Sequence, residues 1–288
     1  PQDLLDLYDP SKIDLPASFG DTLQDKPRVY QRMRNQIWGQ LSTSEVRESI
    51  ANYMALCSMQ DRMLGDLLDA LEKTGQAGNT LALFVGDHGD HQFAHGLLEM
   101  GIHAFKESYH VPAIMRWPKG IVNPGRMVDD LVSLADFAPT FIELCGRQST
   151  ERPTGRSLVR FIKNEPVEDW RDAIFHQTNG NEVYFIQRTV RTKTWRYTYN
   201  PFDFDELYDL ESDPNEMKNL AFPDFTLQPP VYAETREESR IWPHLPDDLD
   251  AVRREMMAKL WQFALEENDE HLFSSYPPVC LATYGPGQ

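Results

Sequence analysis

The stretch "TLALFVGDHGDHQFAHG", residues 80–96, joins an apolar run to a loop with three histidines and two aspartates. Residues 80–85 predict a short hydrophobic strand of the kind that is buried on both faces in a parallel sheet. Gly86 and Gly89 allow a sharp turn directly after it. In open α/β sheets ligands bind beyond the carboxyl ends of the strands. The polar loop therefore falls where such a sheet binds its ligand.

The segments on either side support this fold class. Ser44 is placed to cap a long helix that runs to about Thr74, and its apolar residues recur with a period of 3.6. "VPAIMRW" (Val111–Trp117) predicts a second hydrophobic strand, and Ser133–Gly146 predicts a second helix. Helices that alternate with such strands indicate an α/β domain, which we place at residues 1–163.

The pattern changes after residue 163. Short runs of β-branched and aromatic residues, separated by turn residues, predict a small antiparallel sheet. An amphipathic helix is expected over residues 249–263, followed by an extended tail. We therefore predict a C-terminal subdomain over residues 164–288, and we expect residues 1–30 to be an irregular surface segment. The predicted strands lie in "AIFHQT", "VYFIQRTVRT", "WRYTYN" and "ELYDL".

Composition excludes several function classes. The net charge is −17 over 288 residues, and no basic run offers the phosphate-neutralising patch that nucleic acids need. The basic residues of "RTVRTKTWRY" alternate at strand spacing, which favours a solvated sheet face. No apolar run is long enough to span a membrane. Cys57 and Cys145 lie on apolar helix faces and are expected in the core, so they do not separate a cytoplasmic from a periplasmic location in a bacterium.

Asp87 and His88 are the first candidates for a functional site. A carboxylate and a neutral imidazole are both metal donors, and adjacent residues on a tight turn can converge on one ion. Five of the eight histidines lie between His88 and His110, far more than chance placement gives. Further ligands must come from elsewhere. The structural alternative is that Asp87 caps the turn and His88 is an ordinary loop histidine.

The segment "DHGDHQFAHGLLEMG…FKESYHVPAIMRWPKGI" resembles the second signature region of the sulfatases, in the alkaline-phosphatase-like superfamily. "DDLVSLADFAPTFIELCG" with "GRSL", and "WRYTYN…DELYDLESDPNEMKNLA", are similar to the family's later segments. The resemblance implies the C-terminal half of an alkaline-phosphatase-like mixed sheet flanked by helices. A small antiparallel subdomain with a C-terminal helix would follow it.

The resemblance also implies an activity. Sulfatases hydrolyse sulfate esters with a formylglycine made from a cysteine, beside a divalent ion that is usually calcium. Asp87 and His88 match the family's metal-binding pair, and the expected substrate is a small sulfate ester or a sulfated sugar. The physical basis is electrostatic preorganisation with help from a Lewis acid.

This sequence departs from the family pattern in two places. The formylglycine motif Cys-x-Pro/Ala-x-Arg is absent, since Cys57 heads "CSMQD". We therefore expect the N-terminal segment of the same sulfatase as a partner that supplies the nucleophile. Met100 stands at the position of a family lysine, and a thioether carries no charge. His95, His103 and Lys106 are the candidates for the pocket wall, with loop structure or a solvated lysine as the alternatives.

Two other functions remain open at this point. A phosphate or phosphonate ester hydrolase of the same superfamily would share the Asp87–His88 pair, and only its nucleophile would differ. A non-catalytic binding protein that kept the fold would also fit Met100 and the missing cysteine motif.

Overall fold

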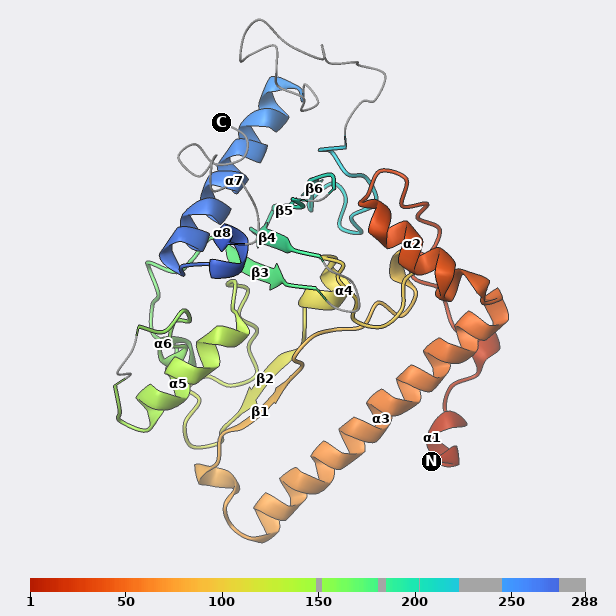
Figure 1. The fold of residues 1–288 in the computed structure, drawn as a ribbon. Coiled ribbons are helices and arrows are strands. Elements are labelled where there is room, and N and C mark those ends of the chain that lie inside the picture. Colours follow the sequence, from red (N-terminus) through yellow and green to blue (C-terminus); the bar gives the residue numbers. More distant parts are fainter. Residues whose placement is uncertain (149–151, 181–184, 202, 223–244, 275–288) are drawn as a thin grey trace, which may run out of the picture. The chain divides into compact units, whose positions relative to one another are not determined.

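The computed structural model describes residues 1–148, 152–180, 185–201, 203–222 and 245–274 (Figure 1). The chain folds into two compact units. The first comprises residues 1–20, 34–100 and 105–171, and the second comprises residues 21–33, 101–104 and 172–288. Helices lie beside antiparallel sheets in the described residues, which agrees with the predicted α/β class.

The longest element of the first unit is α3 (Thr43–Lys73), the orange helix of Figure 1. Its cap is Ser42, so the prediction of Ser44 was wrong. The Ser42 hydroxyl accepts from the Glu45 backbone N–H, and the Glu45 carboxylate accepts from the Ser42 N–H at 2.7 Å. This reciprocal pair satisfies two of the N–H groups that a helix start leaves open, whereas Ser44 lies inside the helix.

Two short strands follow α3 in the first unit. β1 (Ala82–Val85) and β2 (Ala113–Arg116) pair antiparallel, with Val85 opposite Ala113. The expectation of a parallel pair buried on both faces was therefore wrong for these strands. The chain between them turns back through the polar loop, so β2 runs opposite to β1. In the described residues each strand has only the other as its neighbour.

Shorter helices complete the first unit. The predicted helix over residues 133–146 begins with a 3-10 turn, and Ser133 and Asp136 form its capping box. The expectation that Cys57 and Cys145 are core residues was wrong, because both are exposed. A small core instead joins Ile13 and Phe93 to α3. The remaining elements are α1 (Gln2–Leu5), α4 (Lys106–Tyr109), α5 (Phe137–Leu144) and α6 (Val159–Ile162), with α2 (Arg28–Gln36) shared between the units.

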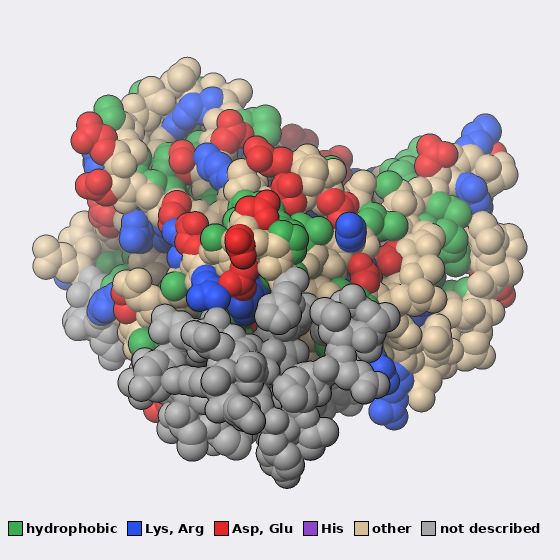
Figure 2. Space-filling view, turned by 90° about the horizontal axis from the view of Figure 1, so that it is seen from above, with side chains coloured by type: hydrophobic (Ala, Val, Ile, Leu, Met, Phe, Trp, Pro, Cys, Tyr) green, Lys and Arg blue, Asp and Glu red, His purple; other side chains and the backbone are tan. Residues whose placement is uncertain are grey.

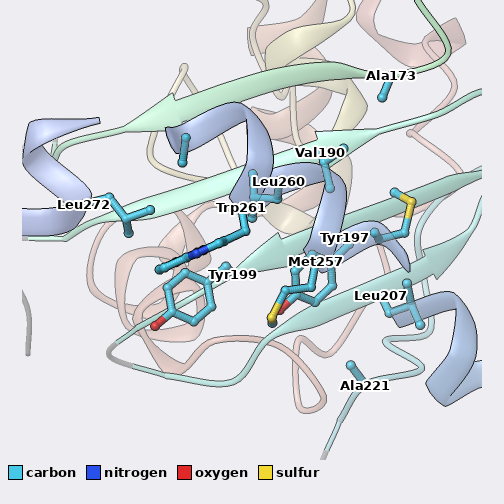
Figure 3. Packing of buried hydrophobic residues seen from close by; sticks show 12 residues of the cluster. Ala173, Val190, Tyr197, Tyr199, Leu207, Ala221, Met257, Leu260, Trp261 and Leu272 are labelled. Atoms are coloured by element: carbon cyan, nitrogen blue, oxygen red, sulfur yellow. The ribbon is translucent and has the colours of Figure 1, made fainter. Parts of the chain in front are cut away.

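The second unit contains the predicted four-stranded antiparallel sheet, in the order β3-β4-β5-β6. Helix α7 (Asp247–Glu266) packs on one face of it, and α8 (Glu270–Ser274) follows. Figure 3 shows Val190, Tyr197 and Leu207 of the sheet facing Met257 and Leu260 of α7. The predicted small antiparallel sheet is therefore present, and one of its faces is buried against α7. The strands are β3 (Ile174–Thr178), β4 (Gln187–Arg191), β5 (Trp195–Tyr199) and β6 (Glu206–Asp209).

The opposite face of this sheet is polar and also buried. Arg196 is 1% exposed and forms ion pairs with Glu206 and Glu216, so the expected solvated face was wrong. Tyr30 lies on the same network and donates to Glu206 Oε1 at 2.9 Å. Tyr30 and Lys26 are fully buried, which also contradicts the irregular surface segment expected over residues 1–30. Their distant partners, Glu206 for Tyr30 and the Met217 carbonyl for Lys26, follow 176 and 191 residues later, beyond the reach of a local pattern.

The described helices include none that is long and apolar enough to cross a membrane. On the face drawn in Figure 2, acidic and basic side chains are interspersed with apolar ones. The predicted tail after residue 274 and most of the Pro-rich stretch over residues 222–248 lie outside the described residues.

Candidate functional site

The turn Asp87–Gly89 leaves β1 at its carboxyl end, as the sequence predicts. The His88 backbone N–H donates to Asp87 Oδ1 at 2.9 Å, and His88 Nδ1 lies 3.0 Å from the Gly89 carbonyl oxygen. A carbonyl oxygen only accepts, so this contact assigns the proton to Nδ1 and leaves the lone pair on Nε2. The turn therefore presents together a carboxylate and a ring nitrogen with a lone pair, two groups that are metal donors by their chemistry.

A glycine is required in this turn. A Cβ at Gly89 would lie 1.8 Å from the Glu107 carbonyl oxygen, a distance that no side chain tolerates. The Gly89 N–H donates to the Ser108 carbonyl oxygen at 2.8 Å. This close approach fixes the turn against helix α4.

Both candidate donors are accessible. The side chain of Asp87 is 89% exposed and that of His88 is 47% exposed. The His88 backbone N–H holds the pKa of the Asp87 carboxyl below its usual value, followed by Asp87's own N–H and the His88 ring. The carboxylate is therefore ionised at neutral pH and open to an approaching cation.

The pair fits one metal ion in part. Asp87 Oδ2 lies 3.8 Å from His88 Nε2. Protein ligands lie about 2.0 to 2.6 Å from such ions, so two donors on one ion are separated by about 3 to 4 Å. No third His, Cys, Asp or Glu joins the pair to make a metal-holding group among the residues the structure describes. Two donors are thus in place, and a complete shell needs others.

The loop after the turn has an unusual backbone. Four side-chain-bearing residues between positions 92 and 101 have positive φ, a conformation that costs free energy and clusters at functional sites. Phe93 and His95 adopt it although they are only 1% and 0% exposed. The short hydrogen bond from the Phe93 N–H to the Leu97 carbonyl, at 2.7 Å, closes this loop. The four residues are Gln92, Phe93, His95 and Glu99.

Ser108 and His91 brace the loop from inside. The Ser108 hydroxyl donates to the Met100 carbonyl oxygen at 3.1 Å and lies 3.0 Å from His91 Nε2. The hydroxyl has one proton, so His91 Nε2–H donates to it. Burial lowers the pKa of His91 to about 3, with a smaller effect of His95, so the ring is neutral. The sequence does not reveal this contact, because the two residues lie 17 positions apart.

The pocket candidates are placed differently from one another. His95 is fully buried in the first unit, where its ring stacks on Phe105 with centroids 3.8 Å apart. His103 belongs to the second unit and meets the Tyr30 ring edge-on at 4.6 Å. A Cβ at Gly101 would lie 2.4 Å from His103 Nδ1, so that glycine makes room for the ring.

Lys106 and Met100 are more accessible than the two buried histidines. Lys106 is the first residue of α4 and is partly exposed, while Met100 is 41% exposed. The first unit thus holds Asp87, His88, His95 and Lys106.

Two family profiles match the chain. The profile described as Sulfatase covers residues 10–147, and the one described as N-sulphoglucosamine sulphohydrolase, C-terminal, covers residues 95–231. Arylsulfatase K of Danio rerio is 32% identical over 204 residues, which make up 68% of this chain and 38% of that protein. The N-acetylglucosamine-6-O-sulfatase of Bacteroides thetaiotaomicron is 29% identical over 201 residues, 67% of this chain and 36% of that protein. The chain therefore spans little more than a third of these relatives.

Solved structures share the fold. A putative sulfatase from Bacteroides thetaiotaomicron superimposes with a TM-score of 0.76 at 23% identity, covering 90% of this chain and 53% of that one. The phosphonate monoester hydrolase of Agrobacterium radiobacter gives 0.77 at 23% identity, with 92% and 54% covered. A third protein, solved in complex with its substrate D-glucosamine-2-N,6-O-disulfate, gives 0.61 at 25% identity, with 83% and 46% covered. About half of each of these structures has no counterpart in this chain.

Proposed function

The chain belongs to the sulfatase family of the alkaline-phosphatase-like superfamily, and we propose on that premise that it is part of a sulfuric ester hydrolase. In this proposal Asp87 and His88 are two ligands of a divalent cation. The observation that carries it is the pair of exposed donors, Asp87 Oδ2 and His88 Nε2, 3.8 Å apart at the end of β1.

The bound cation, calcium in this proposal, would act as a Lewis acid toward the sulfate oxygens. Asp87 brings a negative charge and His88 a neutral nitrogen, so the cation keeps most of its charge for an anionic substrate. This matters because the chain has a net charge of −17, which repels sulfate esters elsewhere on its surface. Additional carboxylate donors would come from the part of the sulfatase that this chain lacks.

We also assign the nucleophile to the part of the sulfatase that this chain lacks. The sequence has no Cys-x-Pro/Ala-x-Arg motif, and Cys57 lies in the middle of α3. We therefore assign the formylglycine to an N-terminal segment of the same sulfatase, which acts with this chain. The 288 residues alone would bind the cation weakly and would not turn over substrate.

His95, His103 and Lys106 remain the candidates for the pocket. Lys106 carries the positive charge that is missing at Met100 and is partly exposed. His95 and His103 are fully buried, which favours a role in shaping the wall over direct contact with substrate. The proposed substrates are small sulfate esters or sulfated sugars, since one relative is named N-acetylglucosamine-6-O-sulfatase.

The activity is tested on protein purified from its source together with everything that copurifies. 4-Nitrophenyl sulfate, 4-nitrophenyl phosphate and a 4-nitrophenyl phosphonate are offered in parallel at equal concentration. Faster release from the sulfate ester is the expected result. Faster release from the phosphonate or the phosphate ester would contradict it.

A phosphate or phosphonate ester hydrolase is the second candidate function. The fold match to the phosphonate monoester hydrolase of Agrobacterium radiobacter, at a TM-score of 0.77, favours it. A non-catalytic binding protein is the third, and Met100 at the position of a charged residue favours that one. No turnover of any of the three esters, with cation bound, would support the binding protein.

A further inference from the structure

Phe93 has a left-handed backbone in the loop that follows the candidate metal turn. Its φ of 68° and ψ of 10° lie in a region where the Cβ of an ordinary residue is crowded. Glycine adopts this conformation without that crowding. A bulky residue keeps it only where the surrounding structure over-determines it, and such residues cluster at functional sites. The contacts of Phe93 must therefore hold it in place.

The side chain of Phe93 makes these contacts. It is 1% exposed and belongs to the small core of the first unit, which includes part of α3. Burial of an aromatic ring removes a large apolar area from water, which offsets the unfavourable backbone. The ring therefore anchors the loop to α3. The other buried residues of this core are Ile13, Val46, Ile50 and Ala51.

Backbone hydrogen bonds close the loop around this anchor. The Phe93 N–H donates to the Leu97 carbonyl oxygen at 2.7 Å, and the Gly96 N–H donates to the Phe93 carbonyl oxygen at 2.9 Å. Further along, the His91 N–H donates to the Glu99 carbonyl oxygen at 3.2 Å. Both backbone polar groups of Phe93 are used, so the loop cannot shift without breaking them.

A short bonded segment joins the anchor to the metal turn. The anchor lies five positions after His88. Between them, Asp90 Oδ1 accepts from the backbone N–H and from the side-chain amide of Gln92, at 2.9 and 2.8 Å. The turn has a second attachment, from the Gly89 N–H to the Ser108 carbonyl oxygen at 2.8 Å. The turn is thus held to α4 directly and to α3 through the loop.

The two candidate metal donors depend on this support. The side chains of Asp87 and His88 are 89% and 47% exposed, so their own packing does little to fix their direction. Donors bind one cation tightly when they are held in position beforehand, because ordering them on binding costs free energy. The attachments of the turn therefore matter for the 3.8 Å separation of Asp87 Oδ2 and His88 Nε2.

We propose that Phe93 is a positioning residue for the metal turn, because its ring anchors the loop to α3 and thereby holds Asp87 and His88 in place for one cation. The cation rests on the proposed function, whereas the anchor and the left-handed backbone do not. A residue that only filled the core would affect the stability of the protein and not its affinity for the cation.

Calcium binding separates these two roles. The protein is purified with its copurifying chains, stripped of metal with a chelator and titrated with calcium chloride in a calorimeter. Phe93→Gly removes the ring and suits the left-handed backbone, so stability is partly spared, and we expect the Kd for calcium to rise at least tenfold. Phe93→Leu keeps an apolar anchor and should raise the Kd less than threefold.

Ile50→Ala is the matched control. It removes side-chain volume from the same core but lies on α3, so it leaves the loop sequence intact. It should change the Kd less than threefold. An unchanged Kd in Phe93→Gly, or an equal rise in Ile50→Ala, overturns the proposal.

Hydrogen exchange tests the anchor without calcium. In the unsubstituted protein the amides of Phe93 and Gly96 should exchange at least a hundredfold more slowly than in an unstructured peptide. Phe93→Gly should speed exchange at Gly96 at least tenfold and leave β6 unchanged, as a sign that the chain is folded. Rapid exchange of both amides in the unsubstituted protein would refute the anchor, even if no variant folds.

The two proposals fail separately. A preparation that releases sulfate, and whose calcium affinity Phe93→Gly leaves unchanged, keeps the function and rejects the positioning role. A preparation that binds calcium with the expected loss in Phe93→Gly, but releases no sulfate, keeps the positioning role and rejects the activity. An unsubstituted protein that binds no calcium rejects both.

Discussion

Removing the Ser108 hydroxyl should lower the free energy of unfolding by more than the loss of one small polar group suggests. Ser108 is 3% exposed and takes part in two hydrogen bonds, with His91 Nε2 and with the Met100 carbonyl. In Ser108→Ala both partners lose this contact inside the protein. A net hydrogen bond is worth about 1 kcal/mol, and a buried group left unsatisfied costs about 1 to 3 kcal/mol. The expected loss in the free energy of unfolding is therefore about 2 to 4 kcal/mol.

The assay is urea unfolding followed by fluorescence, with Ser108→Thr and Ser11→Ala as companions. Threonine keeps the hydroxyl and should recover more than half of the loss. Ser11 is exposed in the same unit and bonds to Asp9 at 2.7 Å, so its removal should cost below about 0.5 kcal/mol. A loss below about 1 kcal/mol in Ser108→Ala, or equal losses at the two serines, would refute the bracing role.

Three further outcomes follow from buried polar groups. Burial raises the pKa of Asp205 to about 6 from 3.8, so the folded state holds that proton more tightly than the unfolded chain. Relative to Asp205→Asn, the wild-type unfolding free energy should fall by about 2 kcal/mol as pH rises from 4 to 6; equal pH profiles would contradict this. Tyr30→Phe removes the hydroxyl that donates to Glu206 Oε1 at 2.9 Å. It should lower the free energy of unfolding, measured in urea, by about 1 to 3 kcal/mol. An unchanged free energy of unfolding would contradict a stabilising role for this hydrogen bond. Arg171→Ala removes two hydrogen bonds of 2.6 Å from the Asp136 carboxylate. It should lower the free energy of unfolding by about 3 kcal/mol in the same assay. A loss as small as that from replacing a surface arginine would contradict this.

Local patterns predicted the regular elements well. The four C-terminal strands and the helix after them follow from alternating and 3.6-period apolar residues. The long helix was expected to begin two residues later than it does, because both Ser42 and Ser44 can act as a cap. Ser42 caps the helix because it is followed three residues later by a glutamate, Glu45, with which it forms a capping box.

The candidate metal turn was also predictable from local sequence. Asp87, His88 and Gly89 are adjacent, so their convergence depends on local backbone geometry alone. His91 and Ser108, or Tyr30 and Glu206, meet only after the chain has folded, and no spacing in the sequence announces them. The division of the chain at residue 163 stays a prediction.

The most direct measurement is the release of inorganic sulfate from 4-nitrophenyl sulfate by the source-purified protein, with and without a chelator, for wild type and Asp87→Ala. We expect turnover that the chelator abolishes and that added calcium restores. We also expect Asp87→Ala to lower turnover at least tenfold, while substitution of Asp14, an exposed carboxylate elsewhere, leaves it unchanged. Chelator-sensitive turnover that is unaffected by Asp87→Ala would contradict the assignment of this chain to the metal site.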